Sequence, residues 1–137
     1  MDYYKLSEEP LQAAILNNEQ GLYRMSVSMS TLAIDLLLKS VLYRIEPAHD
    51  LIMGHNHVGI VAFIESAYPK STSVRHAAKM SRKYFKDSRY SRSENLAVFT
   101  AELAENFISY VELVKNYVNN DCQATFEDLQ GKFNNVD

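Results

Sequence analysis

The sequence predicts an all-α fold, a four- to five-helix antiparallel bundle. The 137 residues include 4 Gly and 3 Pro, so residues that interrupt helices are few. Apolar residues recur every three or four positions over long stretches, which is the period of a helix that buries one face. Strand-like alternation is limited to "SVSMS" at 26–30, and it runs directly into a helical pattern. We expect a single domain with its core at 7–119 and a C-terminal tail at 120–137.

Two helices are predicted in the N-terminal part of the chain. Ser7 is a candidate N-cap for the first, because Glu8 and Glu9 follow it near the positive end of the helix. This helix is expected to end near 17–21. The second covers about 22–44 and is apolar almost all round in its middle, so we place it at the centre of the bundle.

Three further helices are predicted in the rest of the chain. A short helix at about 58–68 is expected to stop before Pro69, and a two-faced helix is expected at 73–85. A long helix at about 94–119 carries apolar residues at alternating steps of three and four, which favours packing against antiparallel neighbours. These residues are Leu96, Phe99, Leu103, Phe107, Tyr110, Val114 and Tyr117.

Charge is distributed unevenly along the chain, although the net charge is only −3. The segment 70–92 holds eight of the 14 Lys and Arg residues and one acid, Asp87, so its charge is +7 and that of the remainder is −10. Within it, four cations fall on an arc of about 60° of one helix, at 100° per residue. They are Arg75, Lys79, Arg82 and Lys86.

This basic stripe has two interpretations. Closely spaced cations can bind the phosphates of a nucleic acid, or they can form a solvated helix face that pairs with acids of a neighbouring helix. The sequence has no glycine-rich phosphate loop, so any phosphate binding is expected to be electrostatic.

Bulk features indicate a cytoplasmic protein that does not enter the membrane. The single Cys122 forms no intrachain disulfide, and the N-terminus is polar and lacks a secretory signal. The most hydrophobic segment contains Asp35 and Lys39, four residues apart on one helix face, where a structural pair or a dimer contact is expected.

Other polar residues give no clear catalytic or metal site. His55 and His57, with His49 nearby, lack a third ligand at a known spacing, so neither a metal nor another cofactor is predicted. The hydroxyl residues are expected to line close helix contacts. They are Ser26, Ser28, Ser30 and Thr31.

Three segments in order resemble the HEPN domain family. "MSTLAIDLLLKSVLYR" resembles its central helix, with Asp35 and Lys39 as the acid and the lysine. "GHNHVGIVAFIE" resembles its following Gly-His segment, with His55 in place. "YFKDSRYSRSEN" resembles its Arg-Tyr-Pro loop before the last core helix, with Arg89 and Tyr90 matching and serine where proline is common.

This resemblance implies a helical bundle that commonly dimerises and that binds or cuts RNA, or acts beside small nucleotidyltransferases. Catalytic members carry an Arg, four to six residues and a His near the last core helix, and they cleave RNA without a metal. No His follows Arg89 or Arg92 at that spacing. Arg44 and His49 have the spacing, but they lie outside the family's catalytic position and Pro47 interrupts them.

We therefore expect a homodimeric binding module with no catalytic residue at the family position. The expected partners are RNA, a nucleotide or a nucleotidyltransferase-like protein. Two alternatives are a metal-independent endoribonuclease toxin with a variant site and a purely structural protein-interaction domain. The predicted contact surface consists of Arg75, Lys79, Arg82, Lys86, Arg89, Tyr90 and Arg92.

Overall fold

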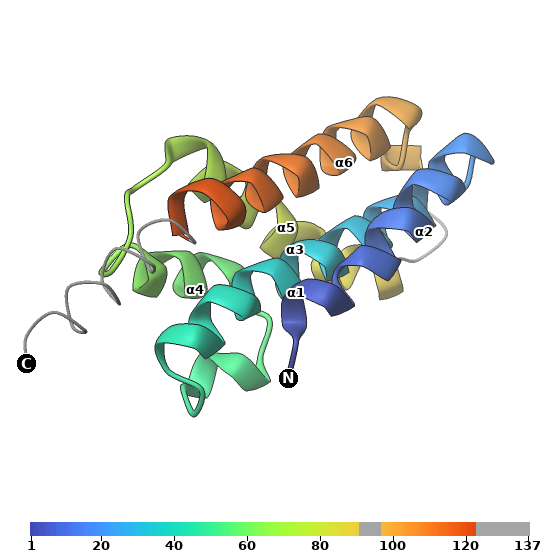
Figure 1. Cartoon of the computed structure of the whole chain (residues 1–137). Helices are drawn as coiled ribbons and strands as arrows, with labels where there is room; N and C mark the ends of the chain where they lie inside the picture. The colour runs from blue at the N-terminus through green and yellow to red at the C-terminus, as the bar shows by residue number, and fades with distance from the viewer. Residues whose placement is uncertain (91–96, 123–137) are drawn as a thin grey trace, which may run out of the picture.

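The computed structural model of the chain confirms the all-α fold (Figure 1). It describes residues 1–90 and 97–122, and this part contains no β-strand. Five of its α-helices have eight or more residues: α2 (Glu8–Glu19), α3 (Tyr23–Ile45), α4 (His57–Ile64), α5 (Thr72–Tyr90) and α6 (Ala101–Asn116). Shorter elements are α1 (Tyr3–Leu6), a 3₁₀ turn η1 (Asp50–Met53) and a π-helical turn η3 (Tyr117–Cys122).

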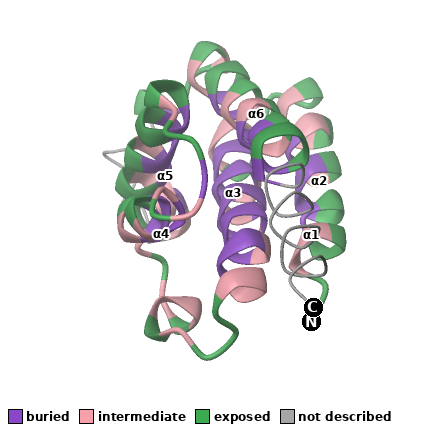
Figure 2. Cartoon of the chain, turned by 60° about the vertical axis from the view of Figure 1, so that its left-hand side comes forward, coloured by how far each residue is buried: buried purple, intermediate pink, exposed green. Residues whose placement is uncertain are grey.

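Helix α3 lies at the centre of the bundle, as its nearly continuous apolar pattern predicts. Helices α4 and α5 pack on one side of it, and α1 and α2 lie on the other (Figure 2). Helix α6 packs on α3 between these two groups and contacts both α2 and α5. Ile34, Leu38 and Val41 are fully buried. By length and composition α3 could cross a membrane, but 72% of its most apolar window is buried inside the protein. The bundle itself therefore covers this apolar surface.

The junction of α1 and α2 differs in detail from the prediction. Ser7 does precede the first residue of α2, but its side chain makes no capping bond. Its hydroxyl donates instead to the carbonyl of Tyr4, because α1 runs directly into α2. The hydroxyl is therefore used to close the preceding turn.

Helix α5 is longer at both ends than the predicted 73–85, and it reaches Tyr90. The expected Arg-Tyr loop is therefore helical at Arg89. Two contacts with α3 explain the extension: Arg24 donates to the carbonyl of Ser88, and Arg89 donates to the carbonyl of Ser28. These tertiary hydrogen bonds stabilise the last turn of α5, which local helix propensity alone does not predict.

Helix α6 begins later than the predicted residue 94. Its first residue is Ala101, because Thr100 is the N-cap and accepts a hydrogen bond from the Leu103 amide. Phe99 lies outside the helix but is still buried, in a cluster with Phe107 and Val27. Residues 94–96 and the tail from 123 lie outside the described part of the chain.

Replacing Gly21 by alanine is expected to lower the free energy of unfolding by about 1 kcal/mol. Gly21 has φ of 75° between α2 and α3, in the left-handed region that disfavours a Cβ. Urea denaturation measures the effect. Gly54→Ala is the matched control, because no atom lies within 4 Å of its added Cβ and its backbone is extended. Equal effects of the two substitutions would contradict the argument.

Candidate functional site

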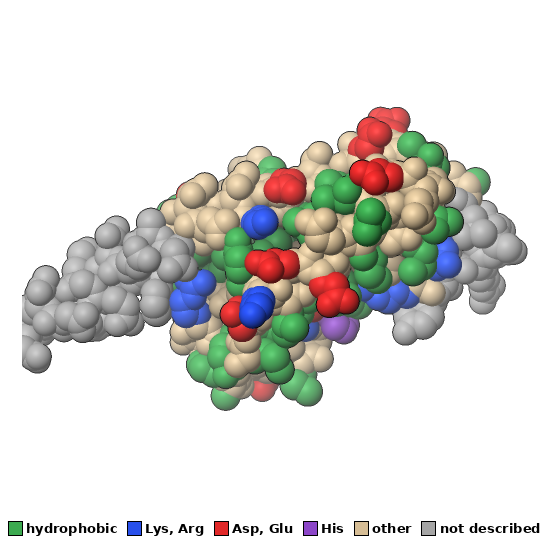
Figure 3. All heavy atoms as spheres, turned by 45° about the vertical axis from the view of Figure 1, so that its right-hand side comes forward, with side chains coloured by type: hydrophobic (Ala, Val, Ile, Leu, Met, Phe, Trp, Pro, Cys, Tyr) green, Lys and Arg blue, Asp and Glu red, His purple; other side chains and the backbone are tan. Residues whose placement is uncertain are grey.

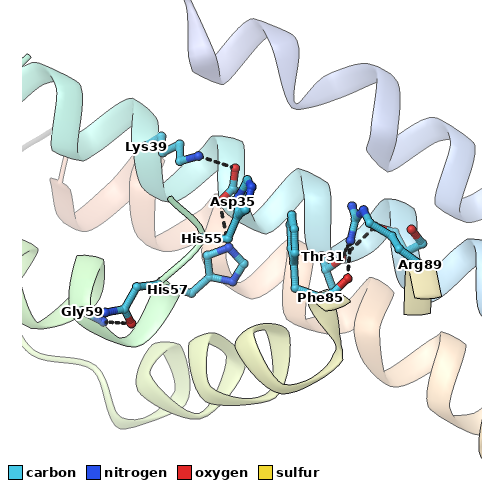
Figure 4. A network of polar contacts seen from close by, with 10 residues as sticks. Thr31, Asp35, Lys39, His55, His57, Gly59, Phe85 and Arg89 are labelled. Atoms are coloured by element: carbon cyan, nitrogen blue, oxygen red, sulfur yellow. Dashed lines mark hydrogen bonds and ion pairs between the residues drawn. The ribbon is translucent and has the colours of Figure 1, made fainter. Parts of the chain in front are cut away.

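A buried carboxylate, Asp35, binds three cationic or titratable side chains (Figure 4). Its side chain is 2% exposed and lies in the middle of α3. Lys39 Nζ lies 2.9 Å from Oδ2, which shows that the predicted pair forms within one subunit. His57 Nε2 lies 2.8 Å and His55 Nδ1 3.2 Å from Oδ1. Asp35 thus holds the start of α4 and the residues just before it against α3.

These partners keep Asp35 ionised despite its burial. Burial alone would raise the pKa of Asp35, because it disfavours the charged form. The hydrogen bonds and charges of His57 and Lys39 outweigh this effect and hold the pKa below its ordinary value of 3.8. The carboxylate is therefore a fixed negative charge at neutral pH.

The two histidines reach Asp35 because of the way α4 begins. Asn56, which lies between them, is the N-cap of α4 and accepts a hydrogen bond from the Gly59 amide at 3.0 Å. A Cβ at position 59 would lie 2.6 Å from Asn56 Nδ2, so only glycine fits without a shift. This tight cap directs both rings towards α3.

Phe85 connects the Asp35 cluster to Arg89. Its ring stacks on His55, with centroids 4.1 Å apart and an interplanar angle of 22°. Arg89 Cζ lies 3.9 Å from the centroid of the same ring. Figure 4 shows Phe85 between His55 and Arg89, which come from different segments. The three positions on which the family resemblance rested thus meet in space.

Arg89 is largely committed to contacts within the protein. One terminal nitrogen donates to the Phe85 carbonyl at 2.7 Å and to Thr31 Oγ1 at 3.1 Å. The other donates to the Ser28 carbonyl at 3.1 Å. The planar guanidinium suits this multiple anchoring. We infer that Arg89 mainly holds α5 on α3 and shapes the site.

Two hollows adjoin this stack on the surface of α5. The smaller, of about 380 Å³, is lined by His55, Arg82, Phe85, Lys86 and Arg89. The larger, of about 750 Å³, lies between α4 and α5 and has an apolar floor with charged residues around it. Arg82 belongs to both hollows, so its guanidinium is the charge that they share. The larger hollow is lined by Val58, Val61, Ala62, Glu65, Arg75, Ala78, Lys79, Arg82 and Lys83.

The predicted basic residues differ in their surroundings. Lys79, Arg82 and Lys86 are exposed on α5, and no carboxylate of the described residues forms an ion pair with them. Arg75 instead pairs with Glu65, the C-cap residue of α4, and its hydrogen bonds lower the pKa of that carboxyl. The Tyr90 side chain and Arg92 lie outside the described part.

The uneven charge of the sequence is also a separation in space. Exposed acids occur on α2, which lies on the other side of α3 from α5, and on α6, which packs against both α3 and α5. Figure 3 shows a face where acidic side chains are scattered among hydrophobic ones, with basic groups between them and towards the left and right sides. The exposed acids on these two helices are Glu8, Glu9, Glu19, Glu102, Glu105 and Glu112.

Sequence reasoning did not identify Phe85 and Lys83 as residues that line the hollows. It also did not place His55 beside the basic stripe. Phe85 precedes Arg89 by four residues, a spacing that puts both on one helix face and was a usable signal. Nothing in the sequence indicated the contact with His55. His49 has a local role, because its Nδ1 accepts a hydrogen bond from the Leu51 amide. The hydroxyl residues of α3 are buried, and Ser26 donates to the Ala14 carbonyl of α2.

Comparison with known proteins gives one finding for this chain. A family model described as HEPN domain matches residues 1–121. No curated protein and no solved structure matches the chain significantly.

Asp35→Ala is expected to lower the free energy of unfolding by about 3 to 5 kcal/mol. The substitution leaves the buried Lys39 ammonium and His57 Nε2 without their acceptor. Urea denaturation checks this, with Asp35→Leu/Lys39→Met as the comparison. The double variant should lose less stability, because it removes both buried charges. A loss below about 1 kcal/mol in Asp35→Ala, as for exposed pairs, would refute the assigned role.

Proposed function

The chain belongs to the HEPN domain family, and from this premise we propose that it is a binding module for single-stranded RNA. The proposed contact surface is the basic face of α5 together with the hollow beside His55. The observation that carries the proposal is the set of exposed cations Lys79, Arg82 and Lys86, which have no ion-pair partner among the described residues. Arg82 and Lys86 line that hollow, and Lys79 lines the larger one next to it.

The length of the basic face favours an extended polyanion over a single nucleotide. From Arg75 to Lys86 the helix rises about 16 Å, at 1.5 Å per residue. Cations spread over this distance can neutralise several successive phosphates and release their counterions. A compact phosphate loop is not required for such binding, since the energy comes from many separate charge contacts.

His55 adds a surface on which a base can stack. Its side chain is half exposed, while Asp35 and Phe85 fix the ring in position. Aromatic rings, including histidine, stack on unpaired bases of single-stranded RNA with little dependence on sequence. We therefore expect RNA to bind with a steep salt dependence and weak base preference.

Arg82→Glu/Lys86→Glu is expected to weaken binding of a fluorescein-labelled single-stranded RNA strongly at low salt. Each lost phosphate contact should reduce the slope of log K against log salt by about 0.7. Fluorescence anisotropy at several salt concentrations measures both quantities.

The matched control is Lys5→Glu/Lys115→Glu, which changes net charge equally on α1 and α6. This control should retain most of the affinity. The proposal would be contradicted if the native protein bound no RNA at low salt, or if both variants lost RNA affinity equally.

A second candidate function is metal-independent RNA cleavage, and the position of His55 favours it. The sequence lacks the family histidine after Arg89, but His55 lies in the same hollow as Arg82 and Arg89. Asp35 contacts His55 Nδ1, an arrangement that orients an imidazole so that Nε2 can transfer a proton. In this reaction Nε2 takes the 2′-hydroxyl proton, and the 2′-oxygen attacks phosphorus as the bond from phosphorus to the 5′-oxygen breaks. The leaving 5′-oxygen takes a proton from water.

His55→Ala is expected to lower the cleavage rate by roughly 100-fold or more if this second function holds. The assay follows a fluorescent RNA in EDTA and identifies 2′,3′-cyclic phosphate ends. His76→Ala serves as the control, because His76 is an exposed residue of α5 that contacts Tyr110. Intact RNA after long incubation with native protein excludes this candidate and leaves the binding function.

The family membership also supports the proposal of a homodimer and of a nucleotidyltransferase-like partner protein. A structural protein-interaction domain is the competing proposal, in which the basic face of α5 docks an acidic protein. The acidic α2 and α6 surfaces leave α5 as the face suited to a polyanion in either case.

A further inference from the structure

The Asp35 cluster has a feature that RNA binding does not use. Asp35, His55 and His57 each present a donor atom, and the three atoms lie within 4.8 Å of one another. In Figure 4 both imidazoles approach the same carboxylate. The sequence spacing argued against a metal because no third ligand could be named, and Asp35 of α3 supplies that ligand from another element.

We propose that Asp35 Oδ1, His55 Nδ1 and His57 Nε2 form a site for a divalent transition metal such as Zn²⁺ or Co²⁺. Two imidazole nitrogens and one carboxylate oxygen are the donors that these ions favour over Mg²⁺ or Ca²⁺. At bond lengths of about 2.0 to 2.2 Å, neighbouring ligands of one ion lie roughly 3 to 3.5 Å apart. The separations of 3.2 Å and 2.8 Å from Oδ1 are close to this range. The two histidine nitrogens lie within 4.8 Å of each other, so binding requires the half-exposed His55 ring to move towards His57.

The tautomer of His57 adds no extra cost to metal binding. Without an ion, His57 Nε2 donates its proton to Asp35, and the buried Nδ1 has no hydrogen-bond partner among the described residues. With an ion on Nε2, His57 is neutral and carries its proton on Nδ1, which is equally without a partner. The number of unpaired buried groups is therefore the same in both states.

Lys39 both supports and limits the site. Its ammonium lies 2.9 Å from Oδ2, so it fixes the carboxylate while Oδ1 faces the histidines. Hydrogen bonding of the second carboxylate oxygen is a common way to orient a metal ligand. The positive charge nevertheless repels a divalent ion, so we expect weaker affinity than in a site without this lysine.

Such an ion would connect α3 to the segment that begins α4. His57 is fully buried, whereas the His55 side chain is half exposed at the rim of the hollow of about 380 Å³. The ion can therefore enter from the His55 side. This inference is independent of the proposed RNA contact, because its readout needs no RNA.

The test is a titration of the EDTA-treated, dialysed protein with Co²⁺, followed by visible absorption and isothermal titration calorimetry. We expect one equivalent per chain with d–d absorption bands, and competition by Zn²⁺. His55→Ala should weaken binding by roughly tenfold or more. His55 is chosen over His57 because its half-exposed side chain can be removed with less risk to the fold. Circular dichroism checks that the variant is folded.

His76→Ala is the control, because it removes an exposed histidine of α5 outside the cluster. It should bind Co²⁺ as the native protein does. Absence of Co²⁺ uptake by the native protein would overturn the proposal. Uptake that folded His55→Ala retains in full, or that His76→Ala loses, would overturn it as well. RNA affinity measured in EDTA stays a separate result, so the two proposals fail independently.

Discussion

A single buried negative charge organises the half of this bundle formed by α3, α4 and α5. Asp35 sits on the central helix, where burial disfavours an ion, and is stabilised there by Lys39 and His57. The need to satisfy that charge brings the segment before α4 against α3. His55 follows from the same segment and stacks on Phe85, and Phe85 in turn lies under Arg89. The hollow beside α5 therefore depends on a carboxylate whose own side chain is only 2% exposed.

The sequence placed Arg89 and the exposed cations of α5 in one contact surface, but the structure gives them different roles. Arg89 donates to carbonyls of two helices and fixes the last turn of α5. Lys79, Arg82 and Lys86 lie outside that network and remain exposed to solvent. An arginine anchored by hydrogen bonds next to exposed cations gives a surface whose shape and charge have separate origins. Substitutions of Arg89 should therefore be interpreted first as changes in packing.

Periodicity predicted the helices well where burial decides their extent and poorly where tertiary contacts do. The central helix was predicted at about 22–44 and is observed as Tyr23–Ile45, because its apolar pattern is continuous. The end of α5 was missed, because Arg24 and Arg89 hold it through bonds to residues far apart in the sequence. The start of α6 was missed because Thr100, which caps the helix, follows an apolar pattern that continues without a break.

The charged residues of the site could be predicted from the sequence, but the contacts between its distant segments could not. The stripe of α5 follows from helical geometry alone, and so does the Asp35 and Lys39 pair. The pairing of Arg75 with Glu65 and the approach of His55 and His57 to Asp35 depend on how α4 packs, which no local spacing encodes.

The separation of charge has a consequence for the protein in solution. With basic residues on α5 and exposed acids on α2, across α3 from it, one copy presents opposite signs on opposite sides. At low ionic strength the basic side of one molecule attracts the acidic side of the next, in a head-to-tail arrangement that does not close on itself. Added salt screens this attraction, because at 0.1 M the Debye length is about 10 Å and exposed charges farther apart than this interact only weakly. Moderate salt should therefore keep concentrated solutions clear, even though the same salt weakens any polyanion held on α5.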